Sequence, residues 1–162
     1  MLALSSDAAP TLSPEQLEAA CRARGLDGVE LVVIPGQDPE QLAARARAPV
    51  VGLRVDSLDE HTAPALARAS RALAAPVSVA GEAIEPALLD RLVATFEAEG
   101  GRLLLGHRTD LDAALAALAT IRARDTAVLG LAWELEPATA NLEAASAVLL
   151  VTRDLLGVVR LH

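Results

Sequence analysis

Short runs rich in Val and Leu alternate along this chain with Ala-, Arg- and Glu-rich stretches that are each long enough for a helix. Successive runs begin about 20 to 30 residues apart, the length of one β-strand with the helix that follows it. Their hydrophobicity is continuous rather than alternating, which is typical of parallel strands buried on both faces. The sequence therefore predicts seven strands, over residues 2–5, 29–34, 50–55, 76–80, 102–106, 128–133 and 158–161.

Helix signals fill the intervals between these strands. Ser13-Pro14 and Asp38-Pro39 each place a capping side chain before a Pro and an acidic first turn. The stretch 147–152 has strand-like composition, but too few residues would separate it from the last strand for a parallel crossover. We therefore assign it to a helix. The six predicted helices cover residues 14–24, 39–48, 59–73, 86–99, 111–124 and 141–156.

Repeated strand–helix units form either an open doubly wound sheet or a barrel. A dinucleotide-binding open sheet has a Gly-rich turn after its first strand, whereas residues 5–10 contain no Gly. We predict an α/β fold, a TIM-type barrel of parallel strands, in one domain over residues 1–162. A full barrel normally takes at least about 200 residues. At 162 residues the chain is predicted to form a short or incomplete barrel of about seven βα units.

Composition excludes several classes of function. Lys is absent, so Schiff-base chemistry and a P-loop are ruled out. A net charge of −8 argues against nucleic-acid binding, which needs a basic surface. Cys21 is the only Cys, so no intrachain disulfide can form and a reducing compartment is indicated. No charge-free stretch reaches the roughly 20 residues of a membrane span. We expect a cytoplasmic protein without nucleic-acid or membrane partners.

Residues 13–20, Ser-Pro-Glu-Gln-Leu-Glu-Ala-Ala, and residues 24–31, Arg-Gly-Leu-Asp-Gly-Val-Glu-Leu, resemble the xylose-isomerase-like TIM-barrel superfamily. Its members open with a helix followed by a similar second strand. Residues 129–134 resemble its sixth strand, which ends in an acidic residue, and 157–162 resemble its seventh, which ends in a His. The superfamily contains sugar isomerases, sugar-phosphate isomerase/epimerases and endonuclease IV-type enzymes. The resemblance implies that the partner is a small-molecule sugar or sugar phosphate.

In that superfamily, acidic and His side chains at the C-terminal strand ends bind a divalent metal that supports proton or hydride movement between adjacent sugar carbons. By position, the resemblance implies that Glu134 and His162 are metal ligands, and His107 at the end of the fifth strand is a third candidate. The metal would be Mn²⁺, Mg²⁺ or Zn²⁺. The family's fifth-strand Glu, fourth-strand His and eighth strand have no counterpart here, so the ligand set is incomplete.

Glu30 matches the family's second-strand Glu and lies in an apolar run, where a carboxylate is costly unless it is paired. We expect Glu30 and Glu82 to be catalytic and to transfer the proton; Glu30 has a structural alternative, pairing with Arg54 or Arg102. The candidate substrate-binding residues are Arg54 and Arg108, which suit anionic groups, and Trp133, which suits stacking on a sugar ring.

Each of the other candidates also has a structural interpretation. His107 is also consistent with a solvated residue just past a strand, Glu134 with an acidic helix start, Trp133 with the core, and His162 with a frayed chain end. Two functions follow. One is a metal-assisted sugar isomerase or epimerase. The other is a non-catalytic, degenerate barrel that serves as a binding or scaffold module. Unpaired strand edges favour a homo-oligomer, unless the chain continues beyond His162 and completes the barrel.

Overall fold

A computed structural model describes residues 3–5, 12–46, 48–80, 84–108, 111–135, 146, 150 and 155–161. Its strands form one sheet in chain order, and every neighbouring pair is parallel. The predicted parallel α/β architecture is confirmed. The strands are β1 (Ala3–Ser5), β2 (Gly28–Val32), β3 (Val50–Val55), β4 (Val77–Ala80), β5 (Leu103–Arg108), β6 (Leu129–Leu135) and β7 (Leu156–Leu161).

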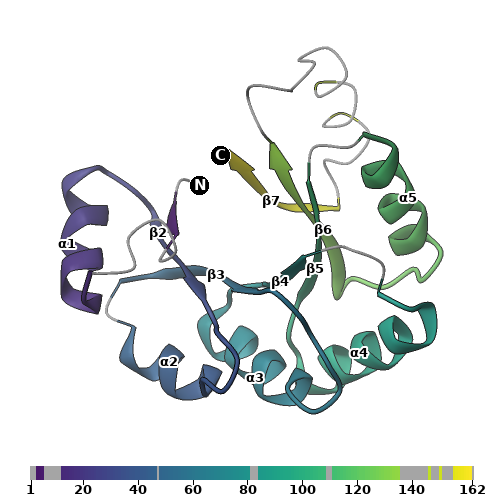
Figure 1. Ribbon diagram of the computed structural model, residues 1–162, viewed down its shortest axis with the longest axis horizontal. Helices are drawn as coiled ribbons and strands as arrows, with labels where there is room; N and C mark the ends of the chain where they lie inside the picture. The colour runs from purple at the N-terminus through teal and green to yellow at the C-terminus, as the bar shows by residue number, and fades with distance from the viewer. Residues whose placement is uncertain are drawn as a thin grey trace.

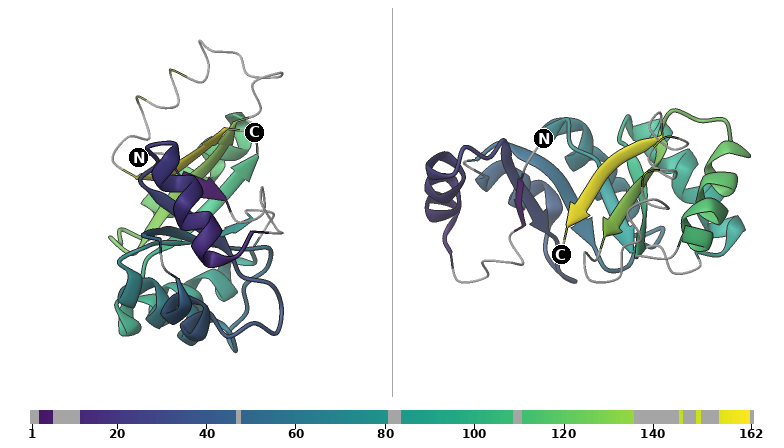
Figure 2. Two further views of the ribbon diagram at one scale, coloured as in Figure 1. Left: turned by 90° about the vertical axis from the view of Figure 1, so that its left-hand side faces the viewer. Right: turned by 90° about the horizontal axis from the view of Figure 1, so that it is seen from above.

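Helices alternate with the strands and lie on the outside of the curved sheet (Figure 1). Seen from above, α1 and α5 lie at opposite ends of the molecule (Figure 2). In the described part of the chain no strand pairing joins β1 to β7, so closure of a barrel is not shown. The helices are α1 (Pro14–Ala23), α2 (Pro39–Arg45), α3 (Ala63–Leu73), α4 (Pro86–Glu99) and α5 (Leu111–Arg122).

These five described helices do not support the predicted count of seven βα units. The predicted helix 141–156 lies almost wholly outside the described residues. None of the helices described is long and apolar enough to span a lipid bilayer.

Local chemistry explains where the helices begin. Ser13 and Gln16 form a capping box at α1, because each side chain accepts a hydrogen bond from the other's backbone N–H. The third helix was predicted from residue 59 but begins at Ala63. The carboxylate of Asp59 accepts hydrogen bonds from the N–H and the hydroxyl of Thr62, both at 2.8 Å, and so holds residues 59–62 in a turn ahead of the helix.

The helix-facing side of the sheet carries the main core. Buried side chains such as Leu53, Val77 and Leu103 alternate along their strands and belong to one cluster with Leu92 and Phe96 of α4. The core is built from Leu, Val, Ile and Ala, as the composition requires, with Phe96 fully buried within it.

The opposite, inner face of the sheet carries a different set of residues. The strand register aligns Glu30 with Gly52, Arg54 with Ser78, and Ser78 with Leu104. Leu104 is fully buried on this inner face and lies close to two glycines: a Cβ added at Gly130 or Gly157 would approach its side chain to 2.8 or 2.7 Å. The side chain of Leu104 therefore occupies space that these two glycines leave.

Candidate functional site

Among the side chains that the structure describes, Glu30 is the buried charged residue of the inner face. Its side chain is only 7% exposed, and its Oε1 lies 3.4 Å from where a Cβ on Gly52 would stand. The glycine therefore leaves space beside the carboxylate. An ionised carboxylate in such a place must be compensated by other groups, and Glu30 does interact with other residues of the protein.

Arg54 lies two residues beyond Gly52, nearer the C-terminal end of β3 and on the same face of the sheet. It is partly buried and engaged in interactions of its own. Ser78, its register partner on β4, is 3% exposed, and its hydroxyl donates to the carbonyl of Leu53 at 3.3 Å. A carboxylate, a guanidinium and a small hydroxyl thus occupy neighbouring positions of the inner face of the sheet.

The C-terminal ends of β5, β6 and β7 carry further charged residues. The register pairs Arg108 with Glu134, and Glu134 with Arg160. His107 pairs instead with Trp133, the residue that precedes Glu134 on β6. The side chains of His107, Arg108 and Glu134, and residues 82 and 162 entirely, lie outside the described part of the chain. Their predicted roles therefore stay predictions.

Trp133 is 3% exposed, and its indole N–H has no hydrogen-bond partner among the residues that the structure describes. Residues two apart on a strand lie on the same face of the sheet, so Trp133 shares a face with Leu131 and not with Ala132. Leu131 belongs to the helix-facing core. The predicted stacking of a sugar ring on Trp133 would require the indole to become exposed.

The described residues contain no group of three or more His, Cys, Asp or Glu side chains that could hold a metal ion. The three predicted ligands, His107, Glu134 and His162, are not among the side chains described. Glu30, which was predicted to be catalytic and not a metal ligand, is a described carboxylate on the inner face.

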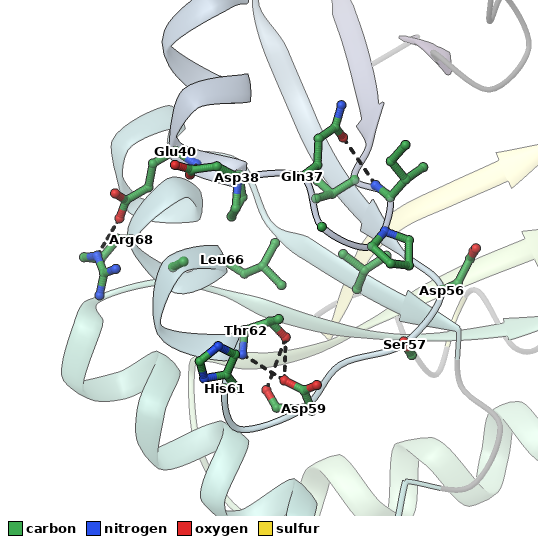
Figure 3. Close-up of a pocket in the computed structure, with 17 residues that line it drawn as sticks. Gln37, Asp38, Glu40, Asp56, Ser57, Asp59, His61, Thr62, Leu66 and Arg68 are labelled. Atoms are coloured by element: carbon green, nitrogen blue, oxygen red, sulfur yellow. Dashed lines mark hydrogen bonds and ion pairs between the residues drawn. The ribbon is translucent and has the colours of Figure 1, made fainter.

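A cavity of about 440 Å³ lies at the C-terminal ends of β2 and β3, against α2 and α3 (Figure 3). We call it the loop pocket, because residues 33–38 and 55–62 supply most of its wall. Its apolar lining includes Val33, Val55 and Leu66, which belong to the helix-facing core. Its polar lining is supplied by Gln37, Asp38, Glu40, Asp56, Ser57, Asp59, His61, Thr62 and Arg68.

Hydrogen bonds hold the polar groups of the loop pocket in place. Asp38 caps α2, where Oδ1 accepts from the N–H groups of Glu40 at 2.9 Å and Gln41 at 3.2 Å. The N–H and hydroxyl of Thr62 lower the pKa of Asp59, which is therefore ionised at neutral pH. Nε of Arg68 donates a hydrogen bond to the carboxylate of Glu40 at 2.5 Å. This hydrogen bond raises the pKa of the Arg68 side chain.

The loop pocket was not predicted from the sequence, although Asp56 directly follows a predicted strand and His61 is exposed. These residues were not grouped with Gln37 and Asp59 into one pocket. The signal was present, since both segments directly follow strands, but only the neighbouring positions of β2 and β3 in the sheet bring the two loops together.

Comparison with known proteins places the fold. No protein-family model matches the chain, and no curated protein matches it by sequence. The solved structure of apo 3-keto-D-glucoside 4-epimerase YcjR from E. coli superposes with a TM-score of 0.72. The match covers 99% of this chain and 78% of that chain, at 13% sequence identity. This chain has the fold of that epimerase. At this identity the likeness concerns the fold, and membership of the xylose-isomerase-like superfamily stays a prediction.

Proposed function

We propose that this protein is a sugar isomerase or epimerase that moves a proton between a substrate carbon and Glu30. The observation that carries the proposal is the burial of Glu30 on the inner face of the sheet, beside the space left by Gly52. A buried carboxylate within reach of a substrate is suited to general acid–base catalysis. The fold shared with an epimerase supports the choice of reaction class.

The proposed chemistry needs a base, a charge stabiliser and a sugar carbonyl. The carboxylate of Glu30 removes the proton from the carbon next to the carbonyl, and the C–H electron pair moves to form an enediolate whose charge rests on oxygen. Arg54, which stays protonated, donates hydrogen bonds to that oxygen. Return of the proton to the opposite face of the carbon gives an epimer, and return to the neighbouring carbon gives an isomer. Glu82 is the second proton carrier in this proposal.

The divalent metal implied by the resemblance stays part of our prediction, with His107, Glu134 and His162 as its ligands. Because the described side chains do not form a ligand group, no step above depends on a metal. Adding Mn²⁺, Mg²⁺ or Zn²⁺ to the assay below measures that requirement directly.

Solvent-exchange NMR tests the proposal. In D₂O, enolisation replaces the proton at the reacting carbon with deuterium, so the ¹H signal of that carbon disappears even when the product does not accumulate. A panel of aldoses, ketoses and 3-keto glucosides should include a substrate that exchanges. Glu30→Gln keeps the shape of the side chain, and it should lower the exchange rate by about 100-fold or more.

The matched control is Glu18→Gln. It removes one carboxylate from the outer surface of α1, where Glu18 pairs with Arg22, and should leave exchange unchanged. Far-ultraviolet circular dichroism confirms that both variants fold. Exchange that survives in Glu30→Gln would overturn the catalytic role. Binding of a sugar without exchange in the unsubstituted protein would favour the alternative function, a non-catalytic binding module.

A further inference from the structure

We propose that the loop pocket binds the non-reacting part of an uncharged, polyhydroxylated substrate and discriminates against its phosphorylated form. The inference rests on the proposed function, because it names the substrate class of the same barrel end. Val33 follows the last residue of β2, and Val55, which follows Arg54, is the last residue of β3. The pocket therefore lies at the C-terminal ends of the two strands that carry Glu30 and Arg54. In this proposal one substrate extends from the pocket, around these strand ends, to Glu30 and Arg54.

The size and lining of the pocket suit a small hydroxylated molecule. A volume of about 440 Å³ falls in the range of small-molecule sites. The apolar residues Val33, Val55 and Leu66 match the C–H faces of a sugar ring, and the surrounding carboxylates, amide and hydroxyls match its hydroxyl groups. An ionised carboxylate is a hydrogen-bond acceptor alone, so it complements hydroxyl donors.

The charge of the pocket opposes a phosphate. Its acidic residues are Asp38, Glu40, Asp56 and Asp59. Its Arg68 is already paired with two carboxylates, Glu40 at 2.5 Å and Glu99 at 3.5 Å. His61 lies beside Asp59 and contributes to the lowered pKa of that carboxylate. The unpaired charge facing a ligand is therefore negative.

The start of α2 is not open to a phosphate. Helix N-termini bind anions through their first N–H groups, but the carboxylate of Asp38 accepts those of Glu40 and Gln41 at α2. At the start of α3, the N–H of Ala63 donates to the carbonyl of Asp59, and Pro64 has no N–H to offer. Among its described residues, the pocket thus lacks an unpaired Arg, and the first N–H groups of α2 are already used.

Asp56 is the residue that we expect to contact the substrate most directly. It is exposed and follows β3 immediately, and its carboxylate points away from the Asp59–Thr62 turn and from α3 (Figure 3). Asp56 lines the pocket and lies two residues after Arg54 along the chain. Its charge therefore acts on a ligand that extends from the pocket towards Arg54.

Matched pairs of ligands test the inference. ¹H–¹⁵N correlation spectra at pH 7.5 would be titrated with D-glucose against D-glucose 6-phosphate, and with D-fructose against D-fructose 6-phosphate. The neutral sugar of a pair should shift the amide resonances of Gln37, His61 and Thr62, and the phosphorylated sugar should bind at least about 10-fold more weakly, as a like charge held close to two carboxylates would predict. Methyl 3-keto-glucoside and D-glucosamine extend the series to a keto sugar and to a cationic one.

Two variants separate charge from folding. Asp56→Asn should weaken binding of the neutral sugar several-fold. It should also reduce the difference in affinity between the neutral sugar and its phosphorylated form. Asp125→Asn removes one carboxylate from the turn after α5, a left-handed position that Asn tolerates, and should change neither value. Equal or tighter binding of the phosphorylated sugar, or shifts that map away from the loop pocket, would overturn the inference. Glu30-dependent exchange on a sugar phosphate alone would overturn it too, while leaving the proposed function standing.

Discussion

Gly157→Ala tests how the inner face is packed, because the three atoms nearest to the added methyl group all belong to the side chain of Leu104. Its Cβ would lie 2.7 Å from Cδ1 and Cδ2 of Leu104 and 3.3 Å from Cγ. Contacts that short force the neighbour to move, and overpacking of a core costs about 1–3 kcal/mol of unfolding free energy. Leu104 is fully buried, so Leu104→Ala alone should cost about 2–5 kcal/mol.

The double variant Leu104→Ala with Gly157→Ala should be no less stable than Leu104→Ala alone. Trimming Leu104 removes the three atoms that the new methyl group would strike, and Ala in place of Gly gains about 0.4–1 kcal/mol from the unfolded chain. The expected coupling free energy between the two substitutions is therefore about 1–3 kcal/mol. Its sign makes the double variant more stable than the sum of the two single effects. Urea unfolding of the four proteins, followed by circular dichroism, gives this value from the midpoints and slopes.

Gly130→Ala supplies the contrast. Its Cβ would lie 2.8 Å from Cδ2 of Leu104 but also 2.9 Å from the carbonyl oxygen of Leu155, which accepts the N–H of Leu131. A backbone oxygen held by the sheet cannot move aside, so Leu104→Ala should rescue Gly130→Ala only in part. Losses of unfolding free energy that simply add for Leu104→Ala and Gly157→Ala would refute this description of the interior. So would a rescue of Gly130→Ala by Leu104→Ala that is as complete as the rescue of Gly157→Ala.

Three further outcomes follow from the described contacts. Phe96→Ala should lower the unfolding free energy by about 3–5 kcal/mol in urea unfolding, because the ring is fully buried, and a loss under 1 kcal/mol would contradict that burial. Ser13→Ala should cost about 1 kcal/mol by the same measurement, since its hydroxyl accepts the N–H of Gln16, with Ser13→Asp as a control that keeps a cap. The NMR-detected pKa of Asp59 should lie below 3.8 and rise in Thr62→Val. Because the folded pKa is depressed, the stabilisation from Asp59 is present above pH 3.8 and lost as the pH falls through the lower value; an unchanged pKa in Thr62→Val would contradict the assigned cause.

Much of the fold could be predicted because it depends on local signals. The Pro residues after Ser13 and Asp38, and the continuous apolar runs, fix helix starts and buried strands within a few residues. The start of α3 was missed by four residues because Asp59 resembles an N-cap. Its carboxylate instead accepts the hydrogen bonds of a turn that ends at Thr62.

The candidate site was predicted less completely because it depends on which strands are neighbours. Glu30 stood out in the sequence as a charge inside an apolar run, and its burial follows from the same pattern. The role of Gly52 was invisible, since only the register of β2 against β3 places a residue without a side chain opposite the carboxylate. The loop pocket was missed for the same reason.

Glycines on the inner face leave space that two different kinds of side chain face. Leu104 occupies the space that Gly130 and Gly157 leave. Gly52 leaves comparable space beside β2, but there the neighbour is Glu30, a carboxylate that a sealed apolar interior would penalise by several kcal/mol. A chain that needed packing alone would gain stability from a Leu or Val at position 30. Under the proposed function, the carboxylate at position 30 serves proton transfer and not packing. Glu30→Leu should accordingly fold at least as stably as Glu30→Gln while losing solvent exchange as completely. A Glu30→Leu variant less stable than Glu30→Gln in urea would instead assign the carboxylate to structure.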